Sequence, residues 1–599
     1  MLKKSAVIFM SLILSVCCLT ACSNNSSKDS SSQVSIISGT SSEKTESNNG
    51  DQSGTQSSAE SSSVSSDEMF SDSDTKDVTS ESVNAEIKLS GNEGTISDTT
   101  RGTSGSEVTI TSKGIYKVTG SSENVSIVIN DTTESGNIYL ILDSVSMTNT
   151  KAPCINVKSC DKLIIQCTGS SSLTYNNSDS SAKEDGAVYA KDDVTINGSG
   201  SLNINSSLHA IVCKKDLKIT GSTLTTEASS IGIKAGNSLR IGGGTINITS
   251  AHDGIKLEND DNDSYFYFEK ADMTVTSGYD GISVKASDDN KEFSGYVTLN
   301  SGKLKITTAS GSGSSSSKNS STSQKGIKTD GNITVAGTEL EISSADDAIH
   351  GNAGITINSG TLELSSSDDG ITASGDLTIN GGTVNVTKSY EGIEGANITI
   401  NDGTVSIKSS DDGINTSGGS DSTQSNDDKW NTSDNSKLTI NGGKVYVNAD
   451  GDGLDSNGSI YITGGTVIVE GPTSNNNGAI DKGDGSGATA SITGGTVLAL
   501  GSSGMAVNFD SGTQCSALVD LSGTSGTEIS VDDGSGFTYT ATKDFQCVVY
   551  SSPSLSQGNS YTIKAGNSTA TMDFTSSLYY SNVSTMGGGM GGPGGVMNR

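Results

Sequence analysis

Short runs of alternating apolar and polar residues recur along most of the chain. One repeat reads Leu377-Thr-Ile379, then an Asn-Gly-Gly turn, then Thr383-Val-Asn-Val386. Alternation over short runs bounded by turn residues predicts strands with one buried side. Beyond the N-terminal segment, no stretch has the period of an amphipathic helix. The pattern therefore predicts an all-β fold.

The strands repeat with a period of about 22 residues. Acids that precede a Gly-Ile or Ala-Ile dipeptide occur at Asp347, Asp369, Glu391 and Asp412, at spacings of 22, 22 and 21 residues. The same phase is continued by His209, Ile231, Asp253, Asp280 and Lys325 upstream and by Asp452 and Asn477 downstream. Three short strands per repeat predict a right-handed parallel β-helix whose coils stack at ~4.8 Å.

Regions outside the repeat differ in composition. The segment 23–84 is Ser-, Asn- and Asp-rich and has too few large apolar side chains to offset its ordering entropy. We expect a signal peptide over 1–22, a disordered linker over 23–84, an N-terminal cap with opening coils over 85–180, the β-helix with acidic turns over 181–544, a C-terminal β cap over 545–585 and a Gly/Met-rich tail over 586–599. Insertions at 258–268, 309–324 and 416–436 are expected to follow the acidic turn and to project from one side.

The N-terminus predicts export. Lys3 and Lys4 precede an apolar run, and Leu19-Thr20-Ala21-Cys22 resembles a bacterial lipobox, which implies that Cys22 is lipidated. The alternative is an ordinary signal peptide with an incidental cysteine. No other stretch approaches the ~20 apolar residues of a membrane span. We expect an extracellular protein held at the cell membrane through its lipid alone.

Composition and charge narrow the function. Only 31% of the residues are hydrophobic and 73 are Gly, which suits a thin solenoid core once the repeat is recognised. With 37 basic and 69 acidic side chains, the net charge of −32 excludes a nucleic-acid-binding protein. We expect a monomer. Cysteines in the repeat region are expected to be small core residues. A disulfide between Cys515 and Cys547 is possible, and the sequence leaves that question open.

Acidic turns at one phase should stack into a line of carboxylates. Like charges ~5 Å apart repel by roughly 3 kcal/mol at an effective dielectric constant near 20. Bound Ca²⁺, which accepts six to eight oxygens in flexible geometry, would relieve this repulsion. The alternative is that the acids face solvent and accept hydrogen bonds from turn N–H groups. The candidate metal ligands are Asp253, Asp280, Asp346, Asp347, Asp368, Asp369, Glu391, Asp411, Asp412, Asp450 and Asp452.

The repeated Asp-Gly-Ile and Leu-Thr-Ile-Asn-Gly-Gly-Thr strings resemble a family of exported bacterial carbohydrate-binding β-helix proteins, which are similar in architecture to family 9 pectate lyases. The strings at 114–120 and 138–143 share the resemblance, which spans about residues 85–580. It implies attachment to cell-wall polysaccharide such as pectin or cellulose, of plant or bacterial origin. It also implies calcium at the acidic turns whose phase is matched by Asp253, Asp280, Asp347, Asp369 and Asp412.

Three functions remain open: calcium-dependent polysaccharide binding, which the sequence favours, a calcium-dependent pectate-lyase-like enzyme, and a non-catalytic adhesin or stalk. Lys256 and Lys285 are weak candidates for the base of a lyase, because many nearby carboxylates would keep a lysine protonated. Aromatic rings near the acidic turns are candidate sugar platforms. These are Tyr265, Tyr267, Tyr279, Tyr390 and Trp430.

Overall fold

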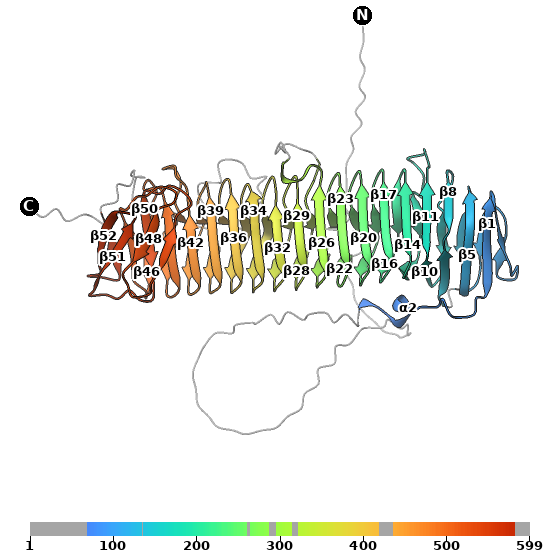
Figure 1. The fold of residues 1–599 in the computed structure, drawn as a ribbon, viewed down its shortest axis with the longest axis horizontal. Helices are drawn as coiled ribbons and strands as arrows, with labels where there is room; N and C mark the ends of the chain where they lie inside the picture. Colours follow the sequence, from blue (N-terminus) through green and yellow to red (C-terminus); the bar gives the residue numbers. More distant parts are fainter. Residues whose placement is uncertain are drawn as a thin grey trace, which may run out of the picture. The chain divides into compact units, whose positions relative to one another are not determined.

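The structure, a computed structural model, describes residues 69–133, 136–259, 264–286, 295–313, 322–417 and 435–581. Strands from these ranges form an elongated stack of coils in which nearly every neighbouring pair is parallel (Figure 1). The predicted all-β, parallel β-helix is thereby confirmed. Each coil contributes one strand to each of three faces, named A, B and C in the order in which the chain visits them after the acidic turn.

The strands of the three faces are as follows. Face A contains β6 (Ser126–Asn130), β9 (Ile155–Ser159), β12 (Gly186–Ala190), β15 (His209–Cys213), β18 (Ile233–Ala235), β21 (Ile255–Asn259), β24 (Ile282–Ala286), β27 (Ile327–Thr329), β30 (Ile349–Gly351), β37 (Ile414–Thr416), β40 (Leu454–Ser456) and β43 (Ile480–Lys482). Face B contains β7 (Ile138–Asp143), β10 (Lys162–Thr168), β13 (Asp193–Gly198), β16 (Asp216–Ile219), β19 (Ser238–Ile241), β22 (Tyr265–Phe268), β25 (Tyr296–Leu299), β28 (Asn332–Val335), β31 (Ile355–Ile357), β38 (Lys437–Ile440), β41 (Ser459–Ile462), β44 (Ala490–Ile492) and β46 (Ser511–Gly512). Face C contains β8 (Ser146–Asn149), β11 (Ser170–Tyr175), β14 (Ser201–Ser206), β17 (Thr223–Ala228), β20 (Thr245–Ser250), β23 (Asp272–Ser277), β26 (Lys303–Thr308), β29 (Glu339–Ser343), β32 (Thr361–Ser365), β34 (Thr383–Ser389), β36 (Thr404–Ser409), β39 (Lys444–Ala449), β42 (Thr466–Glu470) and β45 (Thr496–Gly501). Two long strands, β33 (Ile371–Ile379) and β35 (Ile393–Ile400), run from face A into face B.

The core consists of columns of like side chains along the rod. On face A, Ile255, Ile282, Ile327, Ile349 and Ile371 pair in register on successive strands, and each is fully buried. One continuous apolar cluster extends from Ala85 to Val549. Burial of each such side chain contributes ~1.5–3 kcal/mol. A thin column of apolar side chains is therefore enough to stabilise the fold, which explains the low hydrophobic content of the chain.

Glycines stand where neighbouring coils come closest. A Cβ on Gly413, which follows an acidic turn, would lie 2.6 Å from the carbonyl oxygen of Gly453 and 2.2 Å from a methyl carbon of Val447. Coil-to-coil contact, rather than backbone conformation, therefore requires this glycine. At the turn from face B to face C the reason differs, because Gly382 has a φ of +85°.

Both ends of the stack depart from the repeat. The first coil is built from β1 (Ala85–Gly91), β2 (Glu93–Ile96), β3 (Gly102–Thr103), β4 (Glu107–Ile110) and β5 (Gly114–Glu123), with antiparallel pairs β1–β2 and β3–β4. The other end contains β47 (Ser516–Val519), β48 (Glu528–Val531), β49 (Thr538–Thr540), β50 (Cys547–Ser551), β51 (Ser560–Ala565), β52 (Ser568–Asp573) and β53 (Leu578–Tyr580). Because β45 pairs antiparallel with β50, the coils stop near residue 512, earlier than the expected boundary at 544.

The expected linker over 23–84 also ends earlier than predicted. Residues 69–84, here named the strap, pack along face B and include the short helix α2 (Asp72–Thr75). Asp74 is fully buried, and its carboxylate lies 3.0 Å from Lys162 Nζ and 2.8 Å from Lys218 Nζ. These partners are distant in sequence, so composition alone gives no sign of the contact. Within the described ranges, no helix has the length and hydropathy needed to cross a membrane.

Two further expectations are corrected. The strands that precede the predicted insertions lie on two faces: β21 and β37 are on face A, whereas β26, which precedes the predicted insertion at 309–324, is on face C. The insertions therefore do not all follow the acidic turn, contrary to the expectation. At the last acidic-turn position, the backbone pairing places Gly478 rather than Asn477, because Gly453 N–H donates to the carbonyl of Gly478. Cys515 and Cys547 are buried free thiols.

Candidate metal centre

One side chain per coil stacks at the corner between faces C and A. This set, the anchor row, is Asp253, Asp280, Lys325, Asp347, Asp369, Glu391, Asp412 and Asp452. Each of its aspartates accepts a hydrogen bond from the backbone of the next coil. Glu391 N–H donates to Asp369 Oδ1 at 3.1 Å, and Asp452 N–H donates to Asp412 Oδ1 at 2.7 Å. One carboxylate oxygen of each of these acids therefore stabilises the stacking of neighbouring coils.

A second line of side chains runs parallel to the anchor row, three residues further along each coil. This outer row is Lys234, Lys256, Ser283, Lys328, His350, Thr372, Glu394, Asn415, Asp455 and Asp481, paired in register on face A. Its N-terminal part is basic and its C-terminal part is acidic. The side-chain charge at this corner therefore changes from positive to negative along the rod.

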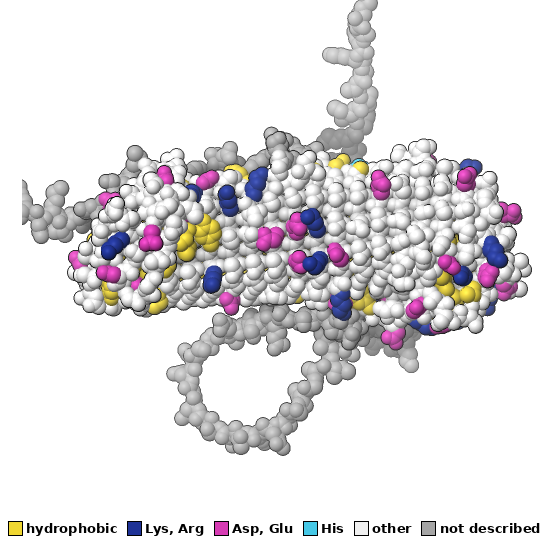
Figure 2. All heavy atoms as spheres, viewed as in Figure 1, with side chains coloured by type: hydrophobic (Ala, Val, Ile, Leu, Met, Phe, Trp, Pro, Cys, Tyr) yellow, Lys and Arg dark blue, Asp and Glu magenta, His cyan; other side chains and the backbone are white. Residues whose placement is uncertain are grey.

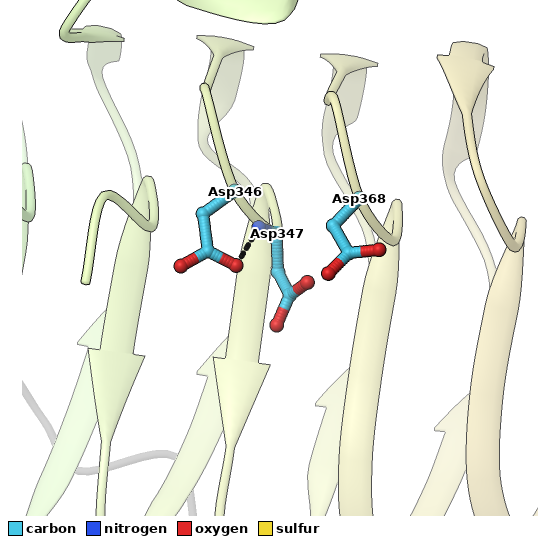
Figure 3. A group of neighbouring side chains, drawn as sticks. All are labelled: Asp346, Asp347 and Asp368. Atoms are coloured by element: carbon cyan, nitrogen blue, oxygen red, sulfur yellow. Dashed lines mark hydrogen bonds between the residues drawn. The ribbon is translucent and has the colours of Figure 1, made fainter. Parts of the chain in front are cut away.

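Asp346, Asp347 and Asp368 form the first acidic cluster, with carboxylate oxygens within 4.8 Å of one another (Figure 3). Lys325 Nζ lies 3.0 Å from Asp346 and 2.5 Å from Asp347. His350 Nδ1 lies 2.8 Å from Asp347 Oδ2. Although burial opposes ionisation, His350 and Lys325 hold the pKa of Asp347 below its usual range. The lysine ammonium therefore already serves this cluster as a cation.

Asp412, Asp452 and Asp455 form the second acidic cluster, again with oxygens within 4.8 Å of one another. In the described part of the chain, no lysine or arginine forms an ion pair with these three acids. Burial raises the pKa of Asp412 to about 6, that of Asp452 to about 7 and that of Asp455 to about 8, and neighbouring carboxylates add to each shift. Among the described residues, therefore, no cationic side chain balances the charge of this cluster.

A neutral oxygen next to the second cluster strengthens the fit to a metal ion. Asn415 lies between Glu394 and Asp455 in the outer row. Its Nδ2 donates to Glu391 Oε2 at 3.0 Å, whereas its Oδ1 is buried and accepts no hydrogen bond from the described residues. Three carboxylates and an amide oxygen are the hard donors that Ca²⁺ prefers, and carboxylates can bind through one or both oxygens. The donor set fits a calcium ion.

Several predicted ligands lie elsewhere. Asp450 is exposed and pairs with Lys543 Nζ at 2.9 Å, so it turns away from the second cluster. Asp411 interacts with the hydroxyl of Tyr390, and this hydrogen bond, together with burial, raises the pKa of Tyr390 above its usual range. Asp369 is half-buried between the two clusters, and desolvation together with the charges of Asp347 and Glu391 raises its pKa well above the ordinary value.

The two candidate bases lie at the basic end of the corner. Lys256 Nζ lies 3.2 Å from Glu258, which also pairs with Lys234 at 3.4 Å. Lys285 is in register with Glu258. Burial raises the pKa of Asp253, and the charge of Asp280 adds to the shift, while Lys256 and Lys285 oppose it. Six strand steps separate Lys256 from Asn415, or about 29 Å, so these lysines are remote from the second cluster.

The predicted aromatic platforms fall in different environments. Tyr279 is 37% exposed and stacks on His252 at 4.7 Å between ring centroids, directly beside the anchor row. Tyr265 is half-buried and stacks on Tyr296 on face B. Tyr267 is fully buried below Phe70 of the strap and donates to Glu269, which excludes stacking on a sugar. Trp430 and Cys22 lie outside the described residues.

Sequence reasoning missed three positions at the acidic end of the outer row. Glu394, Asn415 and Asp481 each follow an acidic-turn position by three residues, a regularity that the 22-residue repeat contained. That spacing places them on the outward side of face A, since alternate residues of a strand share a face.

Comparison with known proteins finds a relative, a solved structure and a family model. A relative from Acetivibrio thermocellus described as a carbohydrate-binding domain-containing protein is 32% identical over 130 residues, which is 20% of this chain and 45% of the relative. This chain thus spans less than half of that relative's length. A solved structure titled as a polysaccharide lyase-like protein from C. thermocellum, in a gadolinium derivative, aligns with 50% of this chain and all of that chain, at 25% identity and a TM-score of 0.34. Residues 104–370 and 368–534 match the family model of the carbohydrate-binding domain-containing proteins, and the chain belongs to that family.

Proposed function

We propose that this protein binds acidic cell-wall polysaccharide of the pectin type through calcium held at the second acidic cluster. The observation that carries the proposal is the convergence of Asp412, Asp452 and Asp455, with Asn415, whose buried Oδ1 has no hydrogen-bond partner among the described residues, paired in register with Asp455. Membership of a carbohydrate-binding family supplies the class of ligand.

Charge explains why a cation is needed. A protein of net charge −32 repels a polyuronate, and the corner between faces C and A gathers many of its acids. A calcium ion that keeps open coordination positions can accept oxygens from the protein and from a sugar carboxylate at once. Binding of an acidic polymer would then depend on calcium even though the polymer and the protein share a sign of charge.

An exposed ring on the same corner supplies a second contact. Tyr279 and His252 form a flat pair whose rings are inclined by only 8°. Aromatic faces offer apolar surface to the C–H face of a sugar ring. A polysaccharide that followed this corner would pass from the Tyr279 pair to the second cluster. We further propose that the protein acts outside the cell from a lipid on Cys22.

The test is retention on polygalacturonate in calcium and in chelator. We expect calcium-dependent retention of the wild-type chain, abolished by EDTA. The double variant Asp412→Asn/Asp452→Asn should lose retention at least about tenfold, the effect of removing a hard-cation site. Asp402→Asn is the matched control, because Asp402 lies in the same coil as Asp412 but is exposed at another corner.

Retention that persists in EDTA, or that the double variant keeps in full, would refute the calcium bridge. The same incubations should be followed by ultraviolet absorbance. Release of unsaturated product would show a lyase in place of a binding protein. Calorimetric titration with calcium alone should show one binding event fewer in the double variant than in Asp402→Asn.

A further inference from the structure

Polar side chains of face B form the site in which the strap is seated. They lie on three successive strands, β10, β13 and β16, and each of them contacts the strap. We name this set the strap site, and its members are Lys162, Gln166, Thr195, Asn197 and Lys218. Figure 2 shows both acidic and basic side chains at the lower edge of the rod, where Figure 1 places α2.

The strap site contacts both the backbone and one carboxylate of the strap. Asn197 Nδ2 donates to the backbone carbonyl of Asp74 at 3.0 Å, and Val78 N–H donates to Gln166 Oε1 at 3.0 Å. The two lysines bind the Asp74 carboxylate, and hydrogen bonds between ionised partners are stronger than neutral ones. The strap site therefore recognises a segment of chain that carries an acid at one fixed position.

An empty strap site would be unfavourable. The side chains of Lys162 and Lys218 are only 16% and 11% exposed, and among the described residues each forms an ion pair with Asp74 alone. Departure of the strap would leave two positive charges facing one position without a counter-ion. Removal of one partner of such a buried pair is strongly destabilising. A rod whose own strap has left would therefore favour an acidic segment from another chain.

An exposed hinge joins the seated part of the strap to the rod. Residues 79–83, here named the hinge, follow the buried Val78 and are all exposed. The hinge is bent by a hydrogen bond from Glu81 N–H to the carbonyl of Val78 at 3.0 Å and by an ion pair of Lys76 with Glu81 at 2.8 Å. An exposed ion pair contributes little to stability. The hinge can therefore straighten without loss of any contact in the strap site.

The chain is long enough for the strap to be seated on a second rod. Asp74 lies over β13, which is four strand steps from β1 through β5, β7 and β10, or ~19 Å. Eleven residues connect Asp74 to Ala85 and would span about 36 Å when extended. The strap runs from Tyr267 on β22 toward Ile115 on β5. A straightened hinge would therefore carry the chain past the end of one rod and onto another rod placed end to end with it.

We infer that the strap site is an interface between two copies of this chain, which exchange straps with their β1 ends facing one another. Each strap then makes on the partner the contacts that it makes on its own rod, so the two arrangements differ mainly at the hinge. The assembly closes at two copies, because each gives one strap and receives one. Exchange is favoured where the chain is concentrated. The inference does not rest on the proposed function, since it involves neither calcium nor carbohydrate.

The experiment reverses the charges of this contact in two populations of the full chain. In one, Asp74→Lys leaves the strap site intact but makes it repel its own strap. In the other, Lys162→Glu/Lys218→Glu makes the site repel the Asp74 of the same chain. When the two are mixed, only exchange pairs every charge. The matched control mixes Asp72→Lys, at an exposed position of α2, with the same double variant. Thermal unfolding should show that every variant keeps its rod.

We expect each of the two test variants alone to be monomeric by light scattering and to be cleaved rapidly by protease within 69–84. Their mixture should have twice the monomer mass, and its cleavage should be at least about tenfold slower. The control mixture should remain monomeric. A test mixture that stays monomeric, or a control mixture that dimerises to the same extent, would overturn the inference.

The wild-type chain offers a second measurement that needs no charge reversal. It is warmed until protease cuts within 69–84 in a parallel sample, and it is then cooled at high concentration. We expect a dimer that persists on dilution, because its dissociation requires both straps to detach. Asp74→Ala treated in the same way should stay monomeric. A wild-type chain of monomer mass throughout would refute exchange of the natural strap and would leave the proposed function untouched.

Discussion

At the scale of single residues, one side chain separates two similar acidic clusters. Lys325 occupies an anchor-row position that is acidic in most neighbouring coils, and its ammonium lies between Asp346 and Asp347. Burial lowers the pKa of Lys325, but the two carboxylates outweigh that effect and raise it above its usual range. The first cluster therefore contains a cation, whereas no lysine or arginine of the described residues forms an ion pair with the second cluster.

Replacement of Lys325 should convert the first cluster into a metal site. In EDTA, Lys325→Met should lower the free energy of unfolding by about 3 kcal/mol, because removing one partner of a buried ion pair leaves the other uncompensated. Urea unfolding measures this change, and calorimetry should detect one calcium ion more than in the wild-type chain. Lys328→Met, on the outer row, is the control. A Lys325→Met protein of wild-type stability without additional calcium binding would contradict this account.

At the scale of strands, the stacking of coils brings carboxylates of successive acidic turns close enough to shift one another's pKa values. Each acidic turn alone resembles an ordinary Asp-Gly turn, but the fixed register brings carboxylates of successive coils together. Burial raises the pKa of Glu391 to about 8, and Glu394 and Asp412 add to the shift. Together with the second cluster, this gives a group of carboxyls that hold protons near neutral pH.

Without calcium, stability should fall as the pH rises. The unfolded carboxyls ionise near pH 4, whereas the folded pKa values of Asp412, Asp452, Asp455 and Glu391 run from about 6 to about 8. The folded state binds more protons in this window, so its advantage is present below pH 4 and is lost through pH 8. Thermal midpoints in EDTA should decrease from pH 5 to pH 8. Saturating calcium should reverse the trend, and Asp412→Asn/Asp455→Asn should flatten it.

The sequence predicted the strand repeat well because most coils repeat the same Ile column and many repeat the same acidic turn. It predicted the anchor acids for the same reason. It did not predict the strap, since Asp74 meets Lys162 and Lys218 only after the coils have formed. It also could not rank the two clusters, because the difference depends on the contact between Lys325 and Asp347, which lie on separate coils.

At the scale of the whole molecule, the strap and the acidic corner occupy different sides of a three-faced rod. The strap contacts face B through Asp74, which accepts hydrogen bonds from Thr195 at 2.6 Å and Lys218 at 2.8 Å. Val78 adds a small apolar cluster with Ile115 and Ile141. The anchor row lies at the corner between the other two faces. The strap therefore leaves the candidate metal centre uncovered.

Asp74 should hold the strap in place. Burial opposes its ionisation, but Lys218, Thr195 and Ser71 hold its pKa well below the usual range. Asp74→Ala should free the strap by leaving Lys162 and Lys218 unpaired, with the rod intact. Limited proteolysis with mass spectrometry should then show rapid cleavage within 69–84. Asp72→Ala, in the same helix but exposed, should stay resistant, and equal cleavage of both variants would rule out this role for Asp74.

The strap also gives the protein a mechanical property. A pulling force on the chain upstream of Met69 would act on the strap before it acted on any coil. The contacts of the strap would then break one after another, from Phe70 toward β1. Peeling breaks contacts in sequence, whereas pulling a coil loads a whole stack of paired strands in parallel. Residues 69–84 would release about 50 Å of slack. If the rod were bound to a rigid surface, a shear force would thus detach the strap while every coil stayed folded.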